Sequence, residues 1–142
     1  RKKLDGIITL ETGDSEDIRF PNNTFDAAMV AFGVRNFENL EKGLAEMHRV
    51  LKPEGAIMVL EFSKPLKFPV KQLYSFYFKF ILPTLGRLIS GDRAAYTYLP
   101  DSVGAFPAGK EFLKILEKVG FENGRHISLT FGIASIYLAR KA

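Results

Sequence analysis

The stretch LEKGLAEMHRVLKPEGAIMVLEFS, residues 40–63, decides the fold. One apolar stripe runs through its first half at spacings of three and four residues: Leu40, Leu44, Met47 and Leu51. Such spacing predicts a helix with one buried face, and we expect Pro53 and Gly55 to end it. The continuous apolar run 56–60 that follows has strand length. Continuous runs are typical of strands covered on both faces, as in parallel sheets.

Outside this helix and strand, the sequence predicts further elements on both sides. Short apolar runs indicate strands at 7–11 and 25–32 before it. A second helix is expected over 108–119, with Gly120 after it, followed by strands at 125–129 and 133–139. Three residues separate the last two strands, which predicts an antiparallel hairpin. The alternation of strands and helices indicates an α/β fold with a mainly parallel sheet and a C-terminal antiparallel hairpin.

Residues 64–106 interrupt this pattern with four prolines and many aromatic side chains. Within them, 70–80 resembles an aromatic helix, and Lys71, Lys79 and Arg87 are interleaved with the aromatic residues. Three arrangements suit such a segment. The rings pack on the core, line a flat apolar pocket, or lie against a bilayer surface.

Composition bounds the class of protein. The chain has 142 residues, no cysteine, two histidines and a net charge of +4. The length suits one domain, and the missing cysteines exclude disulfides and thiolate zinc sites. We expect no metal site, because two histidines and no cysteine leave few metal ligands. We expect no nucleic-acid partner, because the basic residues are not gathered in a stripe. With no signal peptide and no apolar stretch near the roughly 20 residues that span a bilayer, a cytoplasmic location is expected.

Polar side chains follow the first predicted strands, where parallel sheets bind ligands. Asp14 and Ser15 suit the amine and ring edge of an adenine, or simply an Asx-turn. Gly33 would let a ligand approach the backbone. Arg35 could orient an anionic oxygen and Asn36 offers a donor and an acceptor. The alternative is that Asn36 caps the next helix and Arg35 pairs on the surface.

Three other titratable side chains have structural explanations as good as functional ones. His48 and His126 are more typical of satisfied structural residues than of ligands. Glu61 ends a predicted strand and suits either a general base or a structural acceptor. No glycine-rich nucleotide turn, P-loop or Gly-x-Ser-x-Gly elbow is present.

The segment RVLKPEG at 49–55, continued by VLEFSKP at 59–65, resembles the ubiquinone/menaquinone biosynthesis C-methyltransferases. FGVRNF at 32–37, LPTLG at 82–86 and YTYLPDS at 96–102 narrow the resemblance to that family. It extends over essentially the whole chain. The family has Gly-Gly where this chain has Glu54 and Gly55, a change within a turn.

The resemblance implies a partial Rossmann-like, class I methyltransferase domain over 1–142, with 64–106 as a helical insert that covers the substrate. It implies S-adenosylmethionine as cofactor and methylation of a ring carbon of a polyprenylated quinol, in quinone biosynthesis. The cofactor-binding residues implied are Asp14, Ser15, Phe32 and Gly33. The catalytic residues implied are Arg35 and Asn36. The insert supplies the substrate-binding candidates Tyr74, Tyr77 and Tyr96.

The family's glycine-rich turn and ribose-binding acidic residue are missing, so the chain resembles the C-terminal portion of such an enzyme. We therefore expect weak or no cofactor binding. We also expect a homodimer, or a rearrangement of the first strand, because the strand at 25–32 would present an open edge. Contact with the inner face of a membrane is a further expectation. The alternatives are a non-catalytic α/β module that binds an apolar ligand or membrane surface, and a less favoured NAD-linked half-domain.

Overall fold

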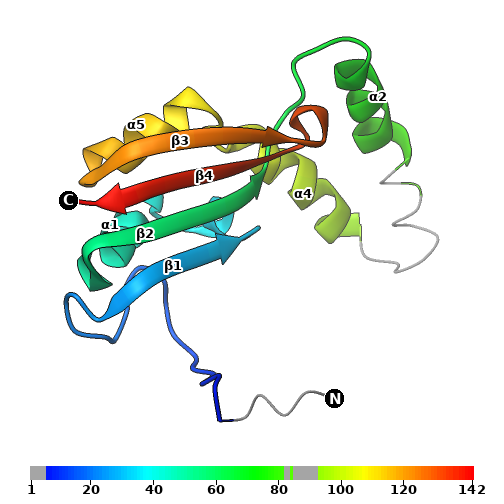
Figure 1. Cartoon of the computed structure of the whole chain (residues 1–142). Coiled ribbons are helices and arrows are strands. Elements are labelled where there is room, and N and C mark those ends of the chain that lie inside the picture. Colours follow the sequence, from blue (N-terminus) through cyan, green and yellow to red (C-terminus); the bar gives the residue numbers. More distant parts are fainter. Residues whose placement is uncertain (1–5, 82–83, 85–92) are drawn as a thin grey trace.

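A computed structural model describes residues 6–81, 84 and 93–142, with the backbone alone for 93–97 (Figure 1). Helix α1 (Leu40–Val50) is followed at once by strand β2 (Leu51–Phe62). Asn39 caps α1, because its side chain accepts a hydrogen bond from the Lys42 amide at 3.0 Å. The predicted helix and strand are confirmed. Pro53 and Gly55, however, lie inside β2 and not in a loop after the helix.

The sheet has four strands in the order β1-β2-β4-β3 (Figure 1). The other strands are β1 (Phe25–Ala31), β3 (Phe121–Leu129) and β4 (Ala134–Lys141). β1 and β2 pair in parallel, whereas β2–β4 and β3–β4 are antiparallel. The α/β fold and the C-terminal hairpin are confirmed. The expectation of a mainly parallel sheet is wrong for the described strands, since one pair of three is parallel.

The predicted strand at 7–11 is also wrong, because these residues form no strand. A strand persists when a neighbour satisfies its backbone donors and acceptors. Within the described residues, β1 ends the sheet without a second partner, and 7–11 do not pair with it. The suggested rearrangement of this segment onto the open edge is therefore not seen.

One face of the sheet carries the core. Helices α1 and α5 (Lys110–Lys118) lie on that face (Figure 1). Along β2 burial alternates: Ile57 and Val59 are buried, while Met58 and Leu60 are partly exposed. The continuous apolar run at 56–60 predicted a strand covered on both faces. Within the described residues, helices cover the face that carries the core. Cover on the second face is not confirmed there, because Met29 of β1 is exposed.

The remaining elements lie at the carboxyl end of β2, where α2 stands beyond the end of the sheet (Figure 1). The predicted aromatic helix is confirmed as α2 (Val70–Phe76), continued by a π-helical turn (Tyr77–Ile81). Helix α4 (Arg93–Ala105) follows. Short 3-10 turns connect β1 to α1 (Val34–Asn36) and β3 to β4 (Thr130–Gly132). The description of 64–106 as an insert that covers a substrate stays a prediction.

Candidate functional site

In the loop after β1, the unusual backbone conformation is that of Phe32 and not that of Gly33. Phe32 has φ = +56°, a left-handed conformation that bulky residues rarely adopt, whereas Gly33 has φ = −120°. Two contacts hold Phe32 there: its amide donates to the Leu60 carbonyl at 2.8 Å, and its ring lies 4.5 Å from that of Phe62. The loop is thus bound to β2 at the carboxyl ends of the two parallel strands.

A buried ion pair connects the same two strand ends. Arg35 Nη1 donates to Glu61 Oε1 at 2.9 Å, and the side chains are 10% and 0% exposed. The guanidinium also donates to the Phe32 carbonyl at 2.5 Å and to Ser102 Oγ at 3.3 Å, and it lies over the Phe62 ring. Glu61 is therefore a structural acceptor. Breaking such a pair leaves a buried charge without a partner, which is strongly destabilising.

Asn36 is held from a distant part of the chain. Tyr98 Oη donates to Asn36 Oδ1 at 2.8 Å, and Tyr98 comes from α4. The alternative that Asn36 caps the next helix is wrong, because Asn39 does so. The alternative that Arg35 pairs on the surface is wrong too, since its pair is buried. Tyr98 and Ser102 are contacts that the sequence analysis missed, although both belong to the YTYLPDS motif.

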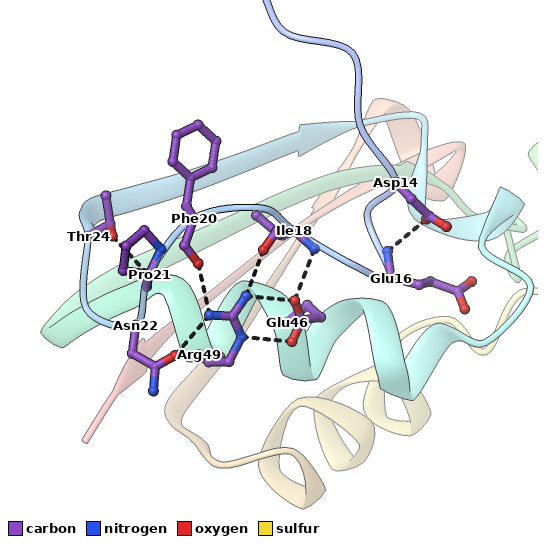
Figure 2. A network of polar contacts seen from close by, with 9 residues as sticks. All are labelled: Asp14, Glu16, Ile18, Phe20, Pro21, Asn22, Thr24, Glu46 and Arg49. Carbon is purple, nitrogen blue, oxygen red and sulfur yellow. Dashed lines mark hydrogen bonds and ion pairs between the residues drawn. The ribbon is translucent and has the colours of Figure 1, made fainter.

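Asp14 and Ser15 lie at a small hollow of about 230 Å³, lined by residues 11–15 and 18–20. Asp14 Oδ1 accepts a hydrogen bond from the Glu16 amide at 2.9 Å, which is the Asx-turn that the sequence suggested (Figure 2). The structure thus gives Asp14 its structural role and also places it beside a cavity. Both interpretations from the sequence stay compatible with this geometry.

A clamp on α1 fixes the segment that follows the Asp14 turn (Figure 2). Arg49 donates to the carbonyls of Ile18 and Phe20 at 2.7 and 2.9 Å, and Glu46 accepts from the Ile18 amide at 3.0 Å. Glu46 and Arg49 also pair at 2.8 Å. The hydrogen bond from Arg49 lowers the pKa of Glu46, and the same bond raises that of Arg49. These hydrogen bonds hold residues 18–20, which line the small hollow, against α1.

A larger hollow, of about 460 Å³, lies between α2, the end of β2 and α4. Its lining is largely apolar, with three lysines: Lys64, Pro65, Leu66, Lys71, Tyr74, Ser75, Phe78, Lys79, Pro100 and Val103. Tyr74 Oη is buried and has no hydrogen-bond partner in the described structure. Burial raises the pKa of this hydroxyl. An orphaned buried hydroxyl of this kind suits a polar group of a bound ligand.

The three predicted substrate-binding tyrosines do not share one cavity in the described structure. Tyr74 lines the larger hollow, whereas Tyr77 is not among its lining residues and is part exposed to solvent. Tyr96 belongs to α4, but its side chain lies outside the described residues. Helix α4 contacts both the 32–37 loop and the larger hollow. Its Tyr98 and Ser102 bind the 32–37 loop, while Pro100 and Val103 line the cavity.

Both histidines have structural partners. His48 Nε2 lies 3.2 Å from the Gly120 carbonyl, and burial together with the Lys141 charge lowers the His48 pKa. His126 Nε2 lies 2.8 Å from Ser135 Oγ, and its ring stacks on Tyr137.

Within the described ranges, 6–81, 84 and 93–142, no three His, Cys, Asp or Glu side chains gather closely enough to hold a metal ion. None of the helices in these ranges combines the length and apolar character needed to cross a bilayer.

Known proteins resemble this chain over nearly its full length. Residues 2–141 match the ubiE/COQ5 methyltransferase family. A demethylmenaquinone methyltransferase of Bacteroides fragilis is 46% identical over 141 residues, which are 99% of this chain and 58% of that protein. The ubiquinone/menaquinone biosynthesis C-methyltransferase UbiE of Geobacter sulfurreducens is 48% identical, over 96% of this chain and 53% of that protein. The chain therefore spans little more than half the length of these relatives.

The fold also resembles solved methyltransferases. A SAM-dependent methyltransferase from Aquifex aeolicus superposes with a TM-score of 0.60 at 18% identity, over 99% of this chain and 61% of that protein. At this identity the likeness shows the fold alone. It confirms the class I methyltransferase architecture that the sequence motifs implied.

Proposed function

This chain belongs to the ubiE/COQ5 methyltransferase family, and on that premise we propose that it takes part in S-adenosylmethionine-dependent C-methylation of a polyprenylated quinol, such as demethylmenaquinol. The observation that carries the proposal is the match over residues 2–141, at 46–48% identity to quinone-pathway methyltransferases. The geometry supports it, because the family motif at 32–37 forms a loop that α4 braces, and α4 also lines the larger hollow.

The cofactor fits the described residues in part. A hollow of about 230 Å³ beside Asp14 and Ser15 is smaller than the roughly 300–1,000 Å³ of sites that enclose a whole ligand of this size. It suits one end of the cofactor, and we assign the adenine to it. Phe32 and Gly33 directly follow β1 at its carboxyl end, and we assign them to the remainder of the cofactor. The glycine-rich turn that would hold the amino-acid part is missing from this sequence.

When bound, S-adenosylmethionine supplies an electrophilic methyl group on a sulfonium. The chain's own residues would bind and orient the electron-rich quinol, whose ring carbon forms the new carbon–carbon bond as the methyl–sulfur bond of the cofactor breaks and a neutral thioether leaves. The same ring carbon then loses its proton to solvent. Positioning of this kind supplies much of the rate in a methyl transfer. We assign contact with a quinol oxygen to the Asn36 amide, held by Tyr98. Arg35, already bound to Glu61, keeps the loop in shape.

The larger hollow is the proposed site of the quinol ring. Its walls are largely apolar, as a flat aromatic ligand requires, and the orphaned Tyr74 hydroxyl offers one directional hydrogen bond. Tyr77 and Tyr96 stay candidates for the outer wall of the site.

Calorimetric titration of S-adenosylmethionine into the chain tests the cofactor assignment. We expect very weak or undetectable heat of binding, because the hollow beside Asp14 encloses one end of the molecule. Micromolar binding would contradict the partial fit and would mean that the described loops, or a second copy, build a complete cofactor site.

A chimera tests the activity itself. Here the chain replaces the matching 141 residues of the Bacteroides fragilis enzyme, and methyl transfer from labelled cofactor to a short-chain demethylmenaquinol is measured. We expect an active chimera, about 10²-fold or more reduced by Asn36→Ala, with Tyr98→Phe intermediate. Asn123→Gly is the matched control, since it removes an exposed amide at the register irregularity of β3, where the backbone has φ = +55°. A folded, cofactor-binding chimera with no transfer would favour the non-catalytic alternative.

A further inference from the structure

The charged side chains that line the larger hollow all have one sign. Three lysines reach it from three parts of the chain: Lys64 follows β2, Lys71 belongs to α2, and Lys79 belongs to the π-helical turn. None of its described lining residues is an Asp or a Glu. Apolar walls of low dielectric focus the field of the charges around them, so a hollow of this kind attracts anions.

The carboxylates nearest to the hollow in the sequence leave this charge in place. Glu61, at the end of β2, already pairs with Arg35 at 2.9 Å. Asp101 follows Pro100 in α4, but it is exposed and does not line the hollow. Within the described residues, none of the three lysines forms an ion pair. A net positive charge therefore faces the hollow.

Lys64 is held at the boundary between the end of β2 and α4. Its Nζ donates to the carbonyl of Gly104, in the last turn of α4, at 2.7 Å. An ammonium group carries several donors, so this hydrogen bond leaves others for a ligand. One positive charge of the hollow is thus fixed by the fold and does not depend on a bound molecule.

Tyr74 supplies a hydrogen-bond donor inside the hollow. Its ring packs on that of Phe78, with ring centres 4.3 Å apart, which fixes the position of the hydroxyl oxygen. This oxygen is buried and has no hydrogen-bond partner in the described structure. Burial raises the pKa of the Tyr74 hydroxyl, so the group keeps its proton and donates at neutral pH. A hydrogen bond to an ionised acceptor is roughly twice as strong as one to a neutral acceptor.

We propose that the larger hollow binds its aromatic ligand as an oxyanion, which accepts the hydrogen bond of Tyr74 and faces the three ammonium groups. For the identity of the ligand this inference rests on the proposed function, in which the ring is that of a quinol, so the bound species is a quinolate. Opposite charges close to a titratable group favour its charged form. An oxyanion also donates more electron density into its ring than a hydroxyl does. The charges that bind the quinol would therefore make its ring carbon a stronger nucleophile.

The ionisation of a bound probe tests the proposal without cofactor or methyl transfer. The probe is 2-naphthol, an aromatic hydroxyl whose neutral and ionised forms differ in absorbance, and it is titrated with the whole chain over a range of pH. We expect the pKa of the bound probe to lie about one unit or more below that of the free probe. The ionised form should accordingly bind about tenfold or more tightly than the neutral form.

Two variants attribute this shift to the hollow. Tyr74→Phe keeps the ring and removes the hydroxyl, and it should weaken binding of the ionised probe about tenfold. Lys71→Gln removes one charge that solvent partly screens, and it should weaken that binding about two- to threefold. Lys114→Gln, an equal change of charge on α5 and outside the hollow, is the matched control and should leave binding unchanged. Naphthalene, which has no hydroxyl, should bind the original chain and all variants equally, which checks that the hollow keeps its shape.

The proposal would be overturned by equal pKa values of the bound and free probe, by a shift that neither variant reduces, or by failure of the chain to bind either probe. These outcomes differ from a failure of the proposed function, which the chimera with the Bacteroides fragilis enzyme measures separately. An active chimera beside an unshifted probe would reject the oxyanion and retain methyl transfer. A shifted probe beside an inactive chimera would retain the oxyanion site and reject methyl transfer.

Discussion

Two aromatic-rich regions of this protein differ in what their rings contact. On the covered face of the sheet, Phe112, Phe121 and Tyr137 are at most 2% exposed, with Phe112 and Tyr137 ring centres 4.6 Å apart. In the segment 66–81, Phe68 and Phe76 are 81% and 55% exposed. The residue types are the same. Aromatic composition therefore says little about burial, which depends on the neighbours that the fold supplies.

The comparison separates stability from binding. Rings in the core bury their full surface on folding and contribute to the free energy of unfolding. Rings in the exposed segment keep much of their surface in water, and burial by a partner is the way in which they would contribute free energy. Substitutions in the two regions should consequently change different measured quantities.

The largest expected effect is on the core side. Phe112→Ala should lower the free energy of unfolding by about 4 kcal/mol, since it leaves a cavity among Phe106, Leu116 and Tyr137. Phe76→Ala, the matched change in the exposed segment, should cost less than about 1 kcal/mol. Urea denaturation of both variants measures the difference. Equal losses would break the comparison, because Phe76 would then be a core residue.

The next effect concerns the buried ion pair at the strand ends. Glu61→Gln should cost about 3 kcal/mol, because it leaves the Arg35 guanidinium, 10% exposed, without its counter-charge. Lys52→Gln breaks the exposed pair with Asp26 and is the control, with a much smaller expected loss of stability because solvent screens that pair. Thermal unfolding of both variants distinguishes them. A loss at Glu61 as small as that at Lys52 would mean that the pair does not brace the loop.

A third prediction concerns the open edge of the sheet, an exposed part of the packed region. We propose that β1 pairs with a second copy of the chain, as exposed strand edges do. Met29→Lys, at a position that is 73% exposed, should shift the molar mass in light scattering toward the monomer and change stability by less than about 0.5 kcal/mol. A wild-type chain that is monomeric at all concentrations would contradict this prediction.

The smallest expected effect is a pH dependence within the packed region. Burial lowers the pKa of His48 below 6.5, with the Lys141 ammonium as the second cause. The unfolded chain thus binds this proton more readily, so His48 contributes stability that is present above pH 6.5 and is lost as the pH falls through the unfolded and then the folded pKa. His48→Gln should flatten that part of the stability curve. An unchanged slope would contradict the assignment.

The local elements could be predicted because their signals lie within a few residues. The stripe at Leu40, Leu44 and Met47 indicated α1, and the three residues after Leu129 indicated the hairpin. The strand at 7–11 failed for a non-local reason: an apolar run becomes a strand when a partner strand is available, and the sequence does not show which partner is present. The mainly parallel sheet failed with it.

The position of several candidate residues at strand ends and cavities could be predicted from the sequence, but their contacts could not. The motifs at 14–15 and 32–36 named side chains that lie at cavities or strand ends. The motif at 96–102 contains Tyr98, yet no local pattern shows that its hydroxyl binds Asn36, which is 62 positions away. The position of Tyr77 outside the larger hollow was equally hidden, because helical spacing alone does not show which face of a lone helix meets the fold.

By itself, then, the sequence determined the family, the helix and strand at its centre and the C-terminal hairpin. These depend on periodicity and on motifs that are continuous in the chain. The tertiary structure alone decided that Glu61 neutralises Arg35, that α4 braces the 32–37 loop, and that Phe76 of α2 remains exposed. The physical reason is that burial and charge pairing depend on residues brought together by folding, across separations that local patterns do not encode.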